Sequence, residues 1–449
     1  MSDKFKKLAD RLTLLAIFLL PWQTRYIIEA GQLNKGPYEY TTISLYALDL
    51  VILLALLFAS LSVFSNKTVG NKIHHRAYWL TVVGLLFFTC FSIFVANDRL
   101  ITLFAWGRLA LGVGLAWLIF SSRLSFNKIL TYLLIAISLQ GLLGAWQFIG
   151  QSAPGNKWLG MASHQSYDLG ASVVELNFAD KQPERWLRAY GSLDHPNMLG
   201  GLAGLGLLMA VYLFINLYAQ GYSRTKEILL SLAIFLNTIA LFVSFSRAGI
   251  LATAIGLIWL FFLNLKNWRR LFLSFFISGL TVFILVVPYG QLYQSRLAAL
   301  GETTISTRLE TKSLAERADY TRHALQLTKN HPLFGVGAGN YGLAVEREVV
   351  KDQLSYYYQP VHNAFLLIFA EIGIFGLICW LLLLTKLLFD CFTKIKTNQE
   401  ASLAIAGLGL IVVIMFFDHW LWSLHFGIIF FWLIIGLIVK VLSKQTETA

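Results

Sequence analysis

The stretch that decides the fold reads VHNAFLLIFAEIGIFGLICWLLLLTKLLF and runs from Val361 to Phe389. From Ala364 onward it is almost wholly apolar, and about 20 such residues in a helix, at about 1.5 Å rise each, span a bilayer. The preceding loop, from about residue 291 to Val361, is rich in charges and aromatic rings. His362 and Asn363 therefore stand at the expected boundary of water and lipid, where a histidine can exchange protons beside a lipid-borne substrate.

Composition places the rest of the chain in the same setting. Of the 449 residues, 57% are hydrophobic and 13% are charged, whereas soluble domains carry about 25% charged residues. The sequence therefore predicts an all-α multi-spanning membrane protein and excludes soluble multidomain classes. The net charge of +12 does not indicate nucleic acid, because basic residues of membrane proteins gather in cytoplasmic loops.

The same span criterion, applied along the chain, predicts about twelve transmembrane helices in a single integral membrane domain, residues 1–449. The spans are expected at 9–30, 42–64, 77–96, 100–121, 128–149, 197–219, 227–246, 248–265, 271–290, 363–389, 401–417 and 423–442.

Basic residues predict the orientation. They cluster at the termini and on the even-numbered connections, as at Lys4, Arg224 and Lys394, which indicates that both termini are cytoplasmic. Two long loops, 150–196 and 291–362, are then extracytoplasmic, and we expect both to contain short helices. The chain is accordingly expected in the cytoplasmic (inner) membrane.

The larger outer loop has two further features. Leucines and alanines recur near helical spacing over residues 307–330, which predicts an amphipathic helix able to cover the membrane surface. Both outer loops also contain arginines, which long loops tolerate whatever their charge. These arginines make the outer face favourable for anions.

Arg247 is a candidate for binding an anion. It stands at the tip of the hairpin Ser246-Arg247-Ala248-Gly249 between two expected spans. An ionisable group at membrane depth costs about 2.5–3.5 kcal/mol and is a functional candidate for that reason. A snorkelling helix-end arginine is the alternative, but the forked guanidinium suits a phosphate, which is our interpretation.

Arg188 opens the run RAYGSLDHPN, which ends at Asn197. Pro196 and Asn197 are typical of a helix start, with Asp194 or His195 near the cap, and helix N-termini favour anions. Arg188 is interpreted as functional. For Asp194 and His195, simple capping is an open alternative.

The remaining candidates are less specific. Arg108 lies inside the fourth expected span, where pairing with another helix and contact with a ligand are both open. His362 has an ordinary pKa near 6.5 and can accept a proton at neutral pH, although capping is also open for it and for Asn363. His419 competes with it, within an aromatic segment that is otherwise typical of an interfacial belt.

Metal and cofactor motifs are not supported. The run from Gly337 to Gly342 fits the pattern GxGxxG, but no βαβ unit surrounds it, so we expect a compact turn. The sequence has no Asp-x-Asp pair and no His-x-x-x-His spacing. No metal ion and no cofactor are therefore expected.

Taken together, several segments resemble the O-antigen ligase and O-antigen polymerase superfamily of membrane glycosyltransferases. The matching segments, in the family's order, are R-x-x-G-x-x-x-HPN-x-L from Arg188 to Leu199, Ser246 to Gly249, Asn330 to Gly337, and His362-Asn363 with the trailing Glu371 to Gly376. The resemblance covers most of the chain from about residue 70 onward.

The resemblance implies a GT-C-type fold and an inverting, metal-independent transfer outside the membrane. The donor would be a glycan on polyprenyl (undecaprenyl) pyrophosphate, and the acceptor a hydroxyl of a glycan, lipid or protein. His362 would activate that hydroxyl, and Arg188 and Arg247 would hold the pyrophosphate, with Arg322 as a third cationic contact. Asn363, His195, Asp194 and Arg108 would have supporting roles.

Four alternatives stay open on the sequence. A polysaccharide polymerase and a protein O-oligosaccharyltransferase of the same superfamily would share these motifs. A flippase for lipid-linked glycans is the rival from another class, since many spans with internal arginines also suit a transporter. A peptidoglycan polymerase of the shape-and-division type would rely on an outer-loop carboxylate, here Asp194, rather than on His362.

Overall fold

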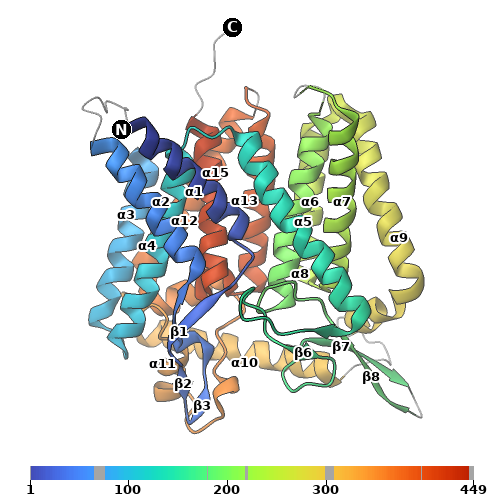
Figure 1. Ribbon diagram of the computed structural model, residues 1–449. Helices are drawn as coiled ribbons and strands as arrows, with labels where there is room; N and C mark the ends of the chain where they lie inside the picture. The colour runs from blue at the N-terminus through green and yellow to red at the C-terminus, as the bar shows by residue number, and fades with distance from the viewer. Residues whose placement is uncertain are drawn as a thin grey trace.

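The computed structural model describes residues 2–64, 76–178, 181–217, 221–298, 308–395 and 397–443. Long helices run side by side through the body of the molecule, and short strands and helices gather at one end (Figure 1). The long helices are α1 (Ser2–Leu19), α2 (Ala47–Phe64), α3 (Arg76–Phe91), α4 (Arg99–Ser121), α5 (Phe126–Gly150), α6 (Pro196–Ile215), α7 (Arg224–Val243), α8 (Arg247–Leu263), α9 (Trp268–Ala298), α12 (Ala364–Lys394), α13 (Glu400–Phe417) and α15 (His425–Ser443).

The remaining elements are short or lie across the bundle. The helices are α10 (Arg308–Asn330), α11 (Tyr341–Glu348), α14 (Trp420–Ser423) and the 3-10 turns η1 (Glu39–Thr41), η2 (Ser92–Phe94), η3 (Leu265–Asn267) and η4 (Ser355–Tyr357). The strands form four antiparallel pairs: β1 (Arg25–Glu29) with β4 (Ile43–Tyr46), β2 (Gln32–Leu33) with β3 (Gly36–Pro37), β5 (Ser152–Ala153) with β6 (His164–Gln165), and β7 (Val173–Phe178) with β8 (Lys181–Leu187).

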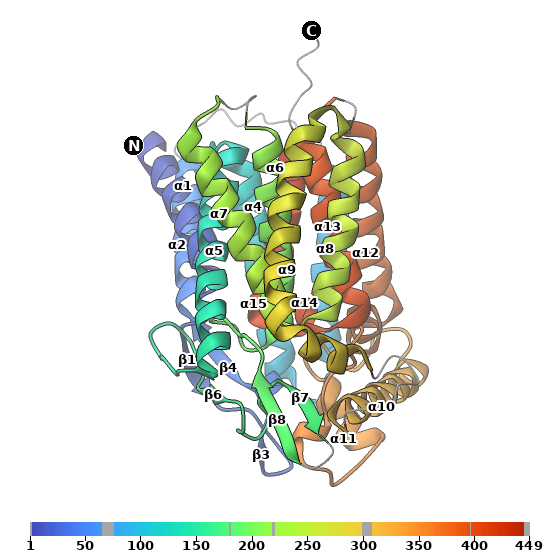
Figure 2. The same cartoon turned by 90° about the vertical axis from the view of Figure 1, so that its right-hand side faces the viewer.

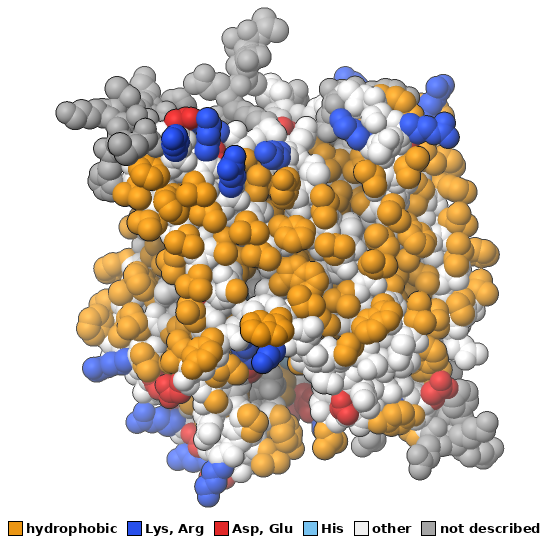
Figure 3. Space-filling model, viewed as in Figure 1, with side chains coloured by type: hydrophobic (Ala, Val, Ile, Leu, Met, Phe, Trp, Pro, Cys, Tyr) orange, Lys and Arg blue, Asp and Glu red, His pale blue; other side chains and the backbone are white. Residues whose placement is uncertain are grey.

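The chain is a multi-span membrane protein. Within the described residues, eight helices are long and apolar enough to cross a bilayer, namely α4, α5, α6, α7, α9, α12, α13 and α15, and shorter apolar helices lie in α2, α3 and α8. Hydrophobic side chains cover the middle of the face in Figure 3, and most of the Lys and Arg side chains lie toward its two ends. This distribution is the one expected of a protein surrounded by lipid.

Two expectations about the outer regions are wrong in part. The first expected span, 9–30, ends early, because α1 stops at Leu19 and Arg25–Glu29 form strand β1 instead. Pro21 cannot continue the hydrogen-bond ladder of a helix. In the loop 150–196, short helices were expected, but the described residues form strands β5 to β8.

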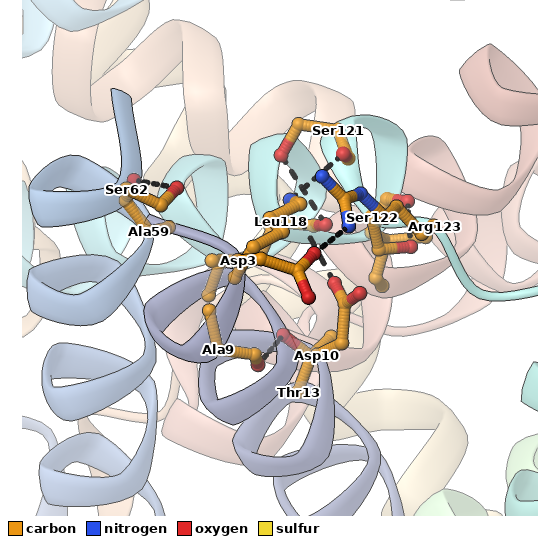
Figure 4. A network of polar contacts seen from close by, with 12 residues as sticks. Asp3, Ala9, Asp10, Thr13, Ala59, Ser62, Leu118, Ser121, Ser122 and Arg123 are labelled. Atoms are coloured by element: carbon orange, nitrogen blue, oxygen red, sulfur yellow. Dashed lines mark hydrogen bonds and ion pairs between the residues drawn. The ribbon is translucent and has the colours of Figure 1, made fainter. Parts of the chain in front are cut away.

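The end of the bundle that carries both chain termini is tied together by charges and is called here the terminal end (Figure 1). Figure 4 shows Asp3 of α1 bonded to Arg123, which follows α4. Lys6 donates to the backbone oxygen of Ser121 at 2.9 Å. These contacts fix the first helix against the α4–α5 connection.

The opposite end, called here the distal end, holds the strands and α10, which lies across the bundle (Figures 1 and 2). Helix α10 covers the segment for which an amphipathic helix was expected, except residue 307, which lies outside the described residues. Inside the bundle, every residue of α6 apart from Asn197 is buried. A helix that is apolar all round belongs in such a core. Helix α6 therefore lies inside the bundle, and its first residues lie at the distal end.

Candidate functional site

Among the helices that begin at the distal end are α6, α8 and α12, which carry the candidate residues. Each has a side-chain cap: His195 Nδ1 accepts from Asn197 N on α6, Ser246 Oγ accepts from Gly249 N on α8, and Asn363 Oδ1 accepts from Leu366 N on α12. Helix N-termini carry unpaired N–H groups and partial positive charge. Their gathering at one end of the bundle favours an anion there.

Close backbone contact brings two of these N-termini together. A Cβ added at Gly249 would lie 2.9 Å from the backbone carbon of Gly200, and a Cβ at Gly200 would lie 2.4 Å from Cβ of Ser246. Only glycine permits this approach. The turn before α8 is tight as well, since Phe245 has a φ of 48°. The geometry holds Arg247, the first residue of α8, beside the start of α6.

A cavity of about 340 Å³ opens between these elements. It is lined by Asn197, Arg247, Ala248, Leu251, Arg296, Leu314, Arg317 and Phe417. The lining therefore combines guanidinium groups from α8, α9 and α10 with apolar side chains, and no carboxylate is among the described residues that line it. We call this space the arginine cavity. Three guanidinium groups gathered in one lining suit a ligand that brings its own negative charge.

Arg188 stands behind this cavity rather than in its lining. Its side chain is buried, Nε donates to Ser244 O at 2.9 Å, and Nη2 donates to Asn197 Oδ1 at 2.7 Å. Burial lowers the pKa of Arg188 to about 10, with Arg247 lowering it further, so the guanidinium stays charged at neutral pH. Arg188 thus orients Asn197 and adds positive charge to the wall.

Helix α10 presents one face to the site. Leu314 and Arg317 line the arginine cavity, and the Tyr320 ring stacks on His362 with 6.0 Å between ring centroids. Burial lowers the pKa of Arg317, and Asp418 opposes that shift. Arg322 lies elsewhere on the helix: its side chain is 77% exposed and is paired with Asp319. Of these two α10 arginines, Arg317 is the one that lines the cavity.

His362 lies next to the cavity in a cluster of polar groups. Its ring is 5.1 Å from that of His419, centroid to centroid, and its Nδ1 is buried without a hydrogen-bond partner among the described residues. Burial lowers the pKa of His362, against the opposing effect of Asp418. At neutral pH the imidazole is therefore unprotonated, which is the form that accepts a proton.

Asp418 is the fixed negative charge of the cluster. It accepts hydrogen bonds from Asn197 Nδ2 at 2.8 Å and from the backbone N–H of His419 at 2.8 Å. Burial alone would raise its pKa, but His419, the other neighbouring histidines and the Asn197 bond together lower it to about 2. The carboxylate thus stays ionised and stabilises a positive charge that forms on His362.

The same cluster contains a group of potential metal ligands. Ligand atoms of His362, Asp418 and His419 lie within 4.8 Å of one another, a set that resembles two-histidine, one-carboxylate ligation. The fit is poor, because His419 Nδ1 already bonds Ser423 Oγ at 2.7 Å and the arginine cavity adjoins the cluster. Nearby cations oppose a divalent ion.

The other sequence candidates lie at the same end. His195 caps α6, and its Nε2 lies 3.2 Å from Ser172 Oγ; burial lowers its pKa to about 3, with Arg188 lowering it further. Asn363 caps α12. Asp194 is exposed, and Arg108 projects from α4 toward a second, smaller cavity. Capping is therefore the observed role of His195 and Asn363.

Arg296 and Arg317 are among the arginines of the loop 291–362, and Asp418 precedes His419; the sequence alone assigns a role to none of the three. Two of them stand at the end of α9 or on the face of α10, and nothing in the spacing shows which face of α10 meets the bundle. Asp418 ends α13 and reaches α6 across more than two hundred residues. No local motif signals such a contact.

The GxGxxG run forms part of the wall around this end, and its compact turn is as expected. Backbone N–H groups of Val336 and Gly337 donate to the carbonyls of Ala370 and Glu371, where α12 is interrupted. Gly373 makes this interruption, with φ 71° and ψ −174°, and a Cβ there would lie 2.1 Å from Leu333 O. Gly373 therefore permits the break in α12.

Two known protein groups are similar to parts of this chain. Residues 232–381 match the model of the O-Antigen ligase family, and this segment includes Arg247, Arg296, Arg317 and His362. The chain is also 27% identical over 217 residues to an O-antigen polymerase of Salmonella muenchen, an alignment covering 47% of this chain and 49% of that protein. The match thus spans about half of the length of that curated relative. Residues 232–381 are thus similar to an O-antigen ligase family domain, and the chain is distantly similar to an O-antigen polymerase.

Proposed function

We propose that this protein transfers a glycan from polyprenyl pyrophosphate to an acceptor hydroxyl at the distal end of the bundle. The observation that carries the proposal is the arginine cavity beside a partly buried His362, whose pKa is lowered. A cationic cavity and a general base, side by side at one end, fit a transfer reaction. A transporter would instead place its site near mid-membrane, between repeated halves.

The arginine cavity suits the donor. Arg247, Arg296 and Arg317 present guanidinium groups, whose forked donors match phosphate oxygens. Leu251, Leu314 and Phe417 supply an apolar part of the same lining, suited to the first units of a prenyl chain. Arg188 does not line the cavity and acts indirectly, through its hydrogen bond to Asn197. Arg322 does not line the arginine cavity, so we assign the third cationic contact to Arg317 instead.

The chemistry divides between the two groups. His362 takes the proton of the acceptor hydroxyl, and the oxygen attacks the anomeric carbon of the donor sugar. The bond from that carbon to the pyrophosphate oxygen breaks, and the leaving group keeps the electron pair. Attack opposite the leaving group inverts the anomeric centre. The proton on His362 then passes to solvent.

Charge stabilisation supplies what this step needs. Diphosphate is a good leaving group, so its departure requires fixed positive charge more than a proton, and the arginines provide it without reorganisation. A hydroxyl is a poor nucleophile, and a positioned base contributes about 10²–10⁴-fold. Asp418 stabilises the imidazolium that forms on His362. Neither metal ion nor cofactor has a part in this mechanism.

The membrane arrangement follows from the same proposal. Twelve spans in one GT-C-type domain over residues 1–449 place the terminal end in the cytoplasm, in line with its basic residues. The loops 150–196 and 291–362 and the arginine cavity then face the outside of the cytoplasmic membrane.

The acceptor distinguishes two forms of the reaction. The matched family model favours an O-antigen ligase, which transfers a glycan to a separate acceptor. The similarity to an O-antigen polymerase favours chain extension, in which the acceptor is a second lipid-linked glycan. Both use the same donor cavity and the same base. Transfer to a protein is a third form of the reaction, and the transfer assay below includes a protein acceptor.

The test supplies purified protein in liposomes with undecaprenyl-pyrophosphate glycan and, separately, a lipid, glycan or protein acceptor. We expect transfer by the unaltered protein and a loss of about 10²–10⁴-fold in His362→Ala. Arg247→Ala should lose about 10²-fold, since it removes one charged contact to the diphosphate.

Matched controls come from the same chain. His331→Ala removes a histidine that is partly exposed and paired with Glu348, and Arg269→Ala removes an exposed arginine that lies over Trp268. Both should keep normal turnover. Undiminished transfer by His362→Ala would exclude it as the base, and the absence of transfer to every acceptor would refute the proposed function.

A further inference from the structure

The imidazole of His362 is held by ring packing rather than by a hydrogen bond at Nδ1. That nitrogen is buried and has no hydrogen-bond partner among the described residues. A histidine that acts as a base is commonly oriented by a third group, which bonds its second ring nitrogen. The torsion that turns a histidine ring about its Cβ–Cγ bond is broad. Another contact must therefore keep the proton-accepting nitrogen directed at the acceptor hydroxyl.

Two rings from different elements bracket the His362 imidazole. The Tyr320 ring of α10 lies nearly parallel to it, with 10° between the planes and 6.0 Å between the centroids. The His419 ring meets it edge-on, at 83° and 5.1 Å. Aromatic rings favour both arrangements at such distances. The Nδ1 atom of His419 is in turn 2.7 Å from Ser423 Oγ, so this side of the bracket is held by a polar contact of its own.

Tyr320 is held in place from outside its own helix. Its side chain is only 5% exposed, and its backbone oxygen accepts a hydrogen bond from Tyr341 Oη at 3.0 Å. Tyr341 is the first residue of α11 and is itself buried. A bond from a neighbouring element to a helix carbonyl restrains the helix at that turn. The Tyr320 ring is therefore a fixed surface against which the His362 imidazole packs.

The glycine run that resembled a nucleotide motif places Tyr341. Its Asn340 donates to Thr102 Oγ1 at 2.8 Å and accepts from Asp98 N at 2.7 Å, which fastens the run to the start of α4. Gly339 turns the chain just before, with a φ of 76° that favours glycine. The run thus has a place in the site without a nucleotide, because it carries the tyrosine that restrains α10.

One turn of α10 carries both kinds of contact to the site. Arg317, which lines the arginine cavity, stands three residues before Tyr320, and residues at this spacing are neighbours on a helix surface. Figures 1 and 2 show α10 lying across the distal end. Its docking therefore brings a donor contact and a base contact together. A change of Tyr320 alone leaves the Arg317 side chain present, which separates the two contributions.

We propose that Tyr320 is a positioning residue for the base: its ring holds the His362 imidazole in the orientation that accepts the proton of the acceptor hydroxyl. The inference rests on the proposed function, because it concerns the orientation of the base assigned there. Tyr320 touches no reacting atom in this role, and its hydroxyl takes no part. A misplacement of about 1 Å near the chemistry can cost about 10²-fold in rate, so this packing is able to control turnover.

Two substitutions at the same position separate the ring from the hydroxyl. Tyr320→Phe keeps the stacked ring and should keep kcat for glycan transfer within about twofold. Tyr320→Leu removes the ring, so kcat should fall by roughly 10- to 100-fold, with the KM values for donor and acceptor within about twofold. Equal losses of kcat in the two variants would assign the effect to the hydroxyl. That result, normal kcat in Tyr320→Leu, or a loss confined to KM would overturn the inference.

His323→Leu is the matched control for the packing of α10. His323 stands one turn later, is also buried at 8% exposed, and has its ring 5.9 Å from that of Tyr357, centroid to centroid. Because its ring packs away from the base, kcat should stay normal, and thermal unfolding of every variant checks that the fold is retained. A loss of kcat equal to that in Tyr320→Leu would attribute the effect to looser docking of α10 and overturn the inference.

A double-mutant cycle tests whether Tyr320 acts through His362. Once His362→Ala has removed the imidazole, adding Tyr320→Leu should lower the remaining transfer rate by less than about twofold, because residues that act as a unit give non-additive losses. A merely structural role would lower the rate in both backgrounds alike. A further loss as large as that seen with His362 present would therefore overturn the inference.

Failure of this inference is distinguishable from failure of the proposed function. Normal transfer by His362→Ala would remove the base itself and, with it, the positioning role. Impaired transfer by His362→Ala together with normal kcat in Tyr320→Leu would refute the positioning role alone and leave the transferase intact. The expected pattern is a loss in His362→Ala, a smaller loss in Tyr320→Leu, and recovery in Tyr320→Phe.

Discussion

Two arginines on α10 provide a matched pair of perturbations. Arg317 lines the arginine cavity, whereas Arg322, five residues on, is 77% exposed and paired with Asp319. Both lie on the same helix and both change to glutamine with the loss of one charge. We expect Arg317→Gln to impair transfer and Arg322→Gln to leave it within about twofold, since an exposed ion pair contributes about 0.2–1 kcal/mol.

The magnitude follows from the surroundings of Arg317. A guanidinium about 5 Å from one phosphate charge gains about 3 kcal/mol at an effective dielectric constant of about 20. Hydrogen bonds to charged groups contribute about 1.5–3 kcal/mol. Because about 1.4 kcal/mol corresponds to one factor of ten, Arg317→Gln should lower kcat/KM for the donor by roughly 10- to 200-fold.

The assay measures initial rates of glycan transfer in liposomes at several donor concentrations, with acceptor saturating. Thermal unfolding of each variant confirms that the fold is retained. Equal losses in Arg317→Gln and Arg322→Gln would mean that α10 contributes only general positive charge. A loss in Arg322→Gln alone would refute the assignment of the cavity-facing side of the helix.

Three further outcomes are expected. Because burial lowers the pKa of His362 below its usual 6.5, the acid limb of the kcat profile should have its midpoint below pH 6.5; a midpoint above pH 7 would contradict this. Asp418→Asn removes the anion that raises the His362 pKa, so the acid limb of the kcat profile should move to lower pH, with kcat reduced about tenfold; an upward shift would refute that role. Gly342→Ala forces a Cβ to within 1.8 Å of Tyr38 Oη and should cost about 1–3 kcal/mol in thermal unfolding, whereas Gly279→Ala, which meets nothing within 4 Å, should not destabilise the protein.

The bundle was largely predictable because membrane spans have a length and composition that a sequence displays. Long apolar runs marked helices such as α6 and α12 within a few residues. The first expected span, 9–30, extended too far past Pro21 and Arg25, because a criterion based on apolar length carries no information on strand pairing. The same reason explains the strands found in the loop 150–196, whose pairing depends on contacts between the strands.

The site was predictable only in part, for a physical reason. Arg247 begins an apolar helix and His362 lies two residues before another, so the sequence itself indicates that both lie near the membrane boundary. Arg317 and Arg322 look alike in the sequence, and only the docking of α10 against the bundle separates their roles. Asp418 becomes recognisable once folding brings it to Asn197 of α6.

The most direct test of the central claim is an electron cryomicroscopy structure of the protein with undecaprenyl pyrophosphate. We predict that the diphosphate lies in the arginine cavity, within hydrogen-bond reach of Arg247 and Arg317, with the prenyl chain leaving past Leu251 and His362 facing the acceptor side. A diphosphate bound at the terminal end, or out of reach of both arginines, would contradict it.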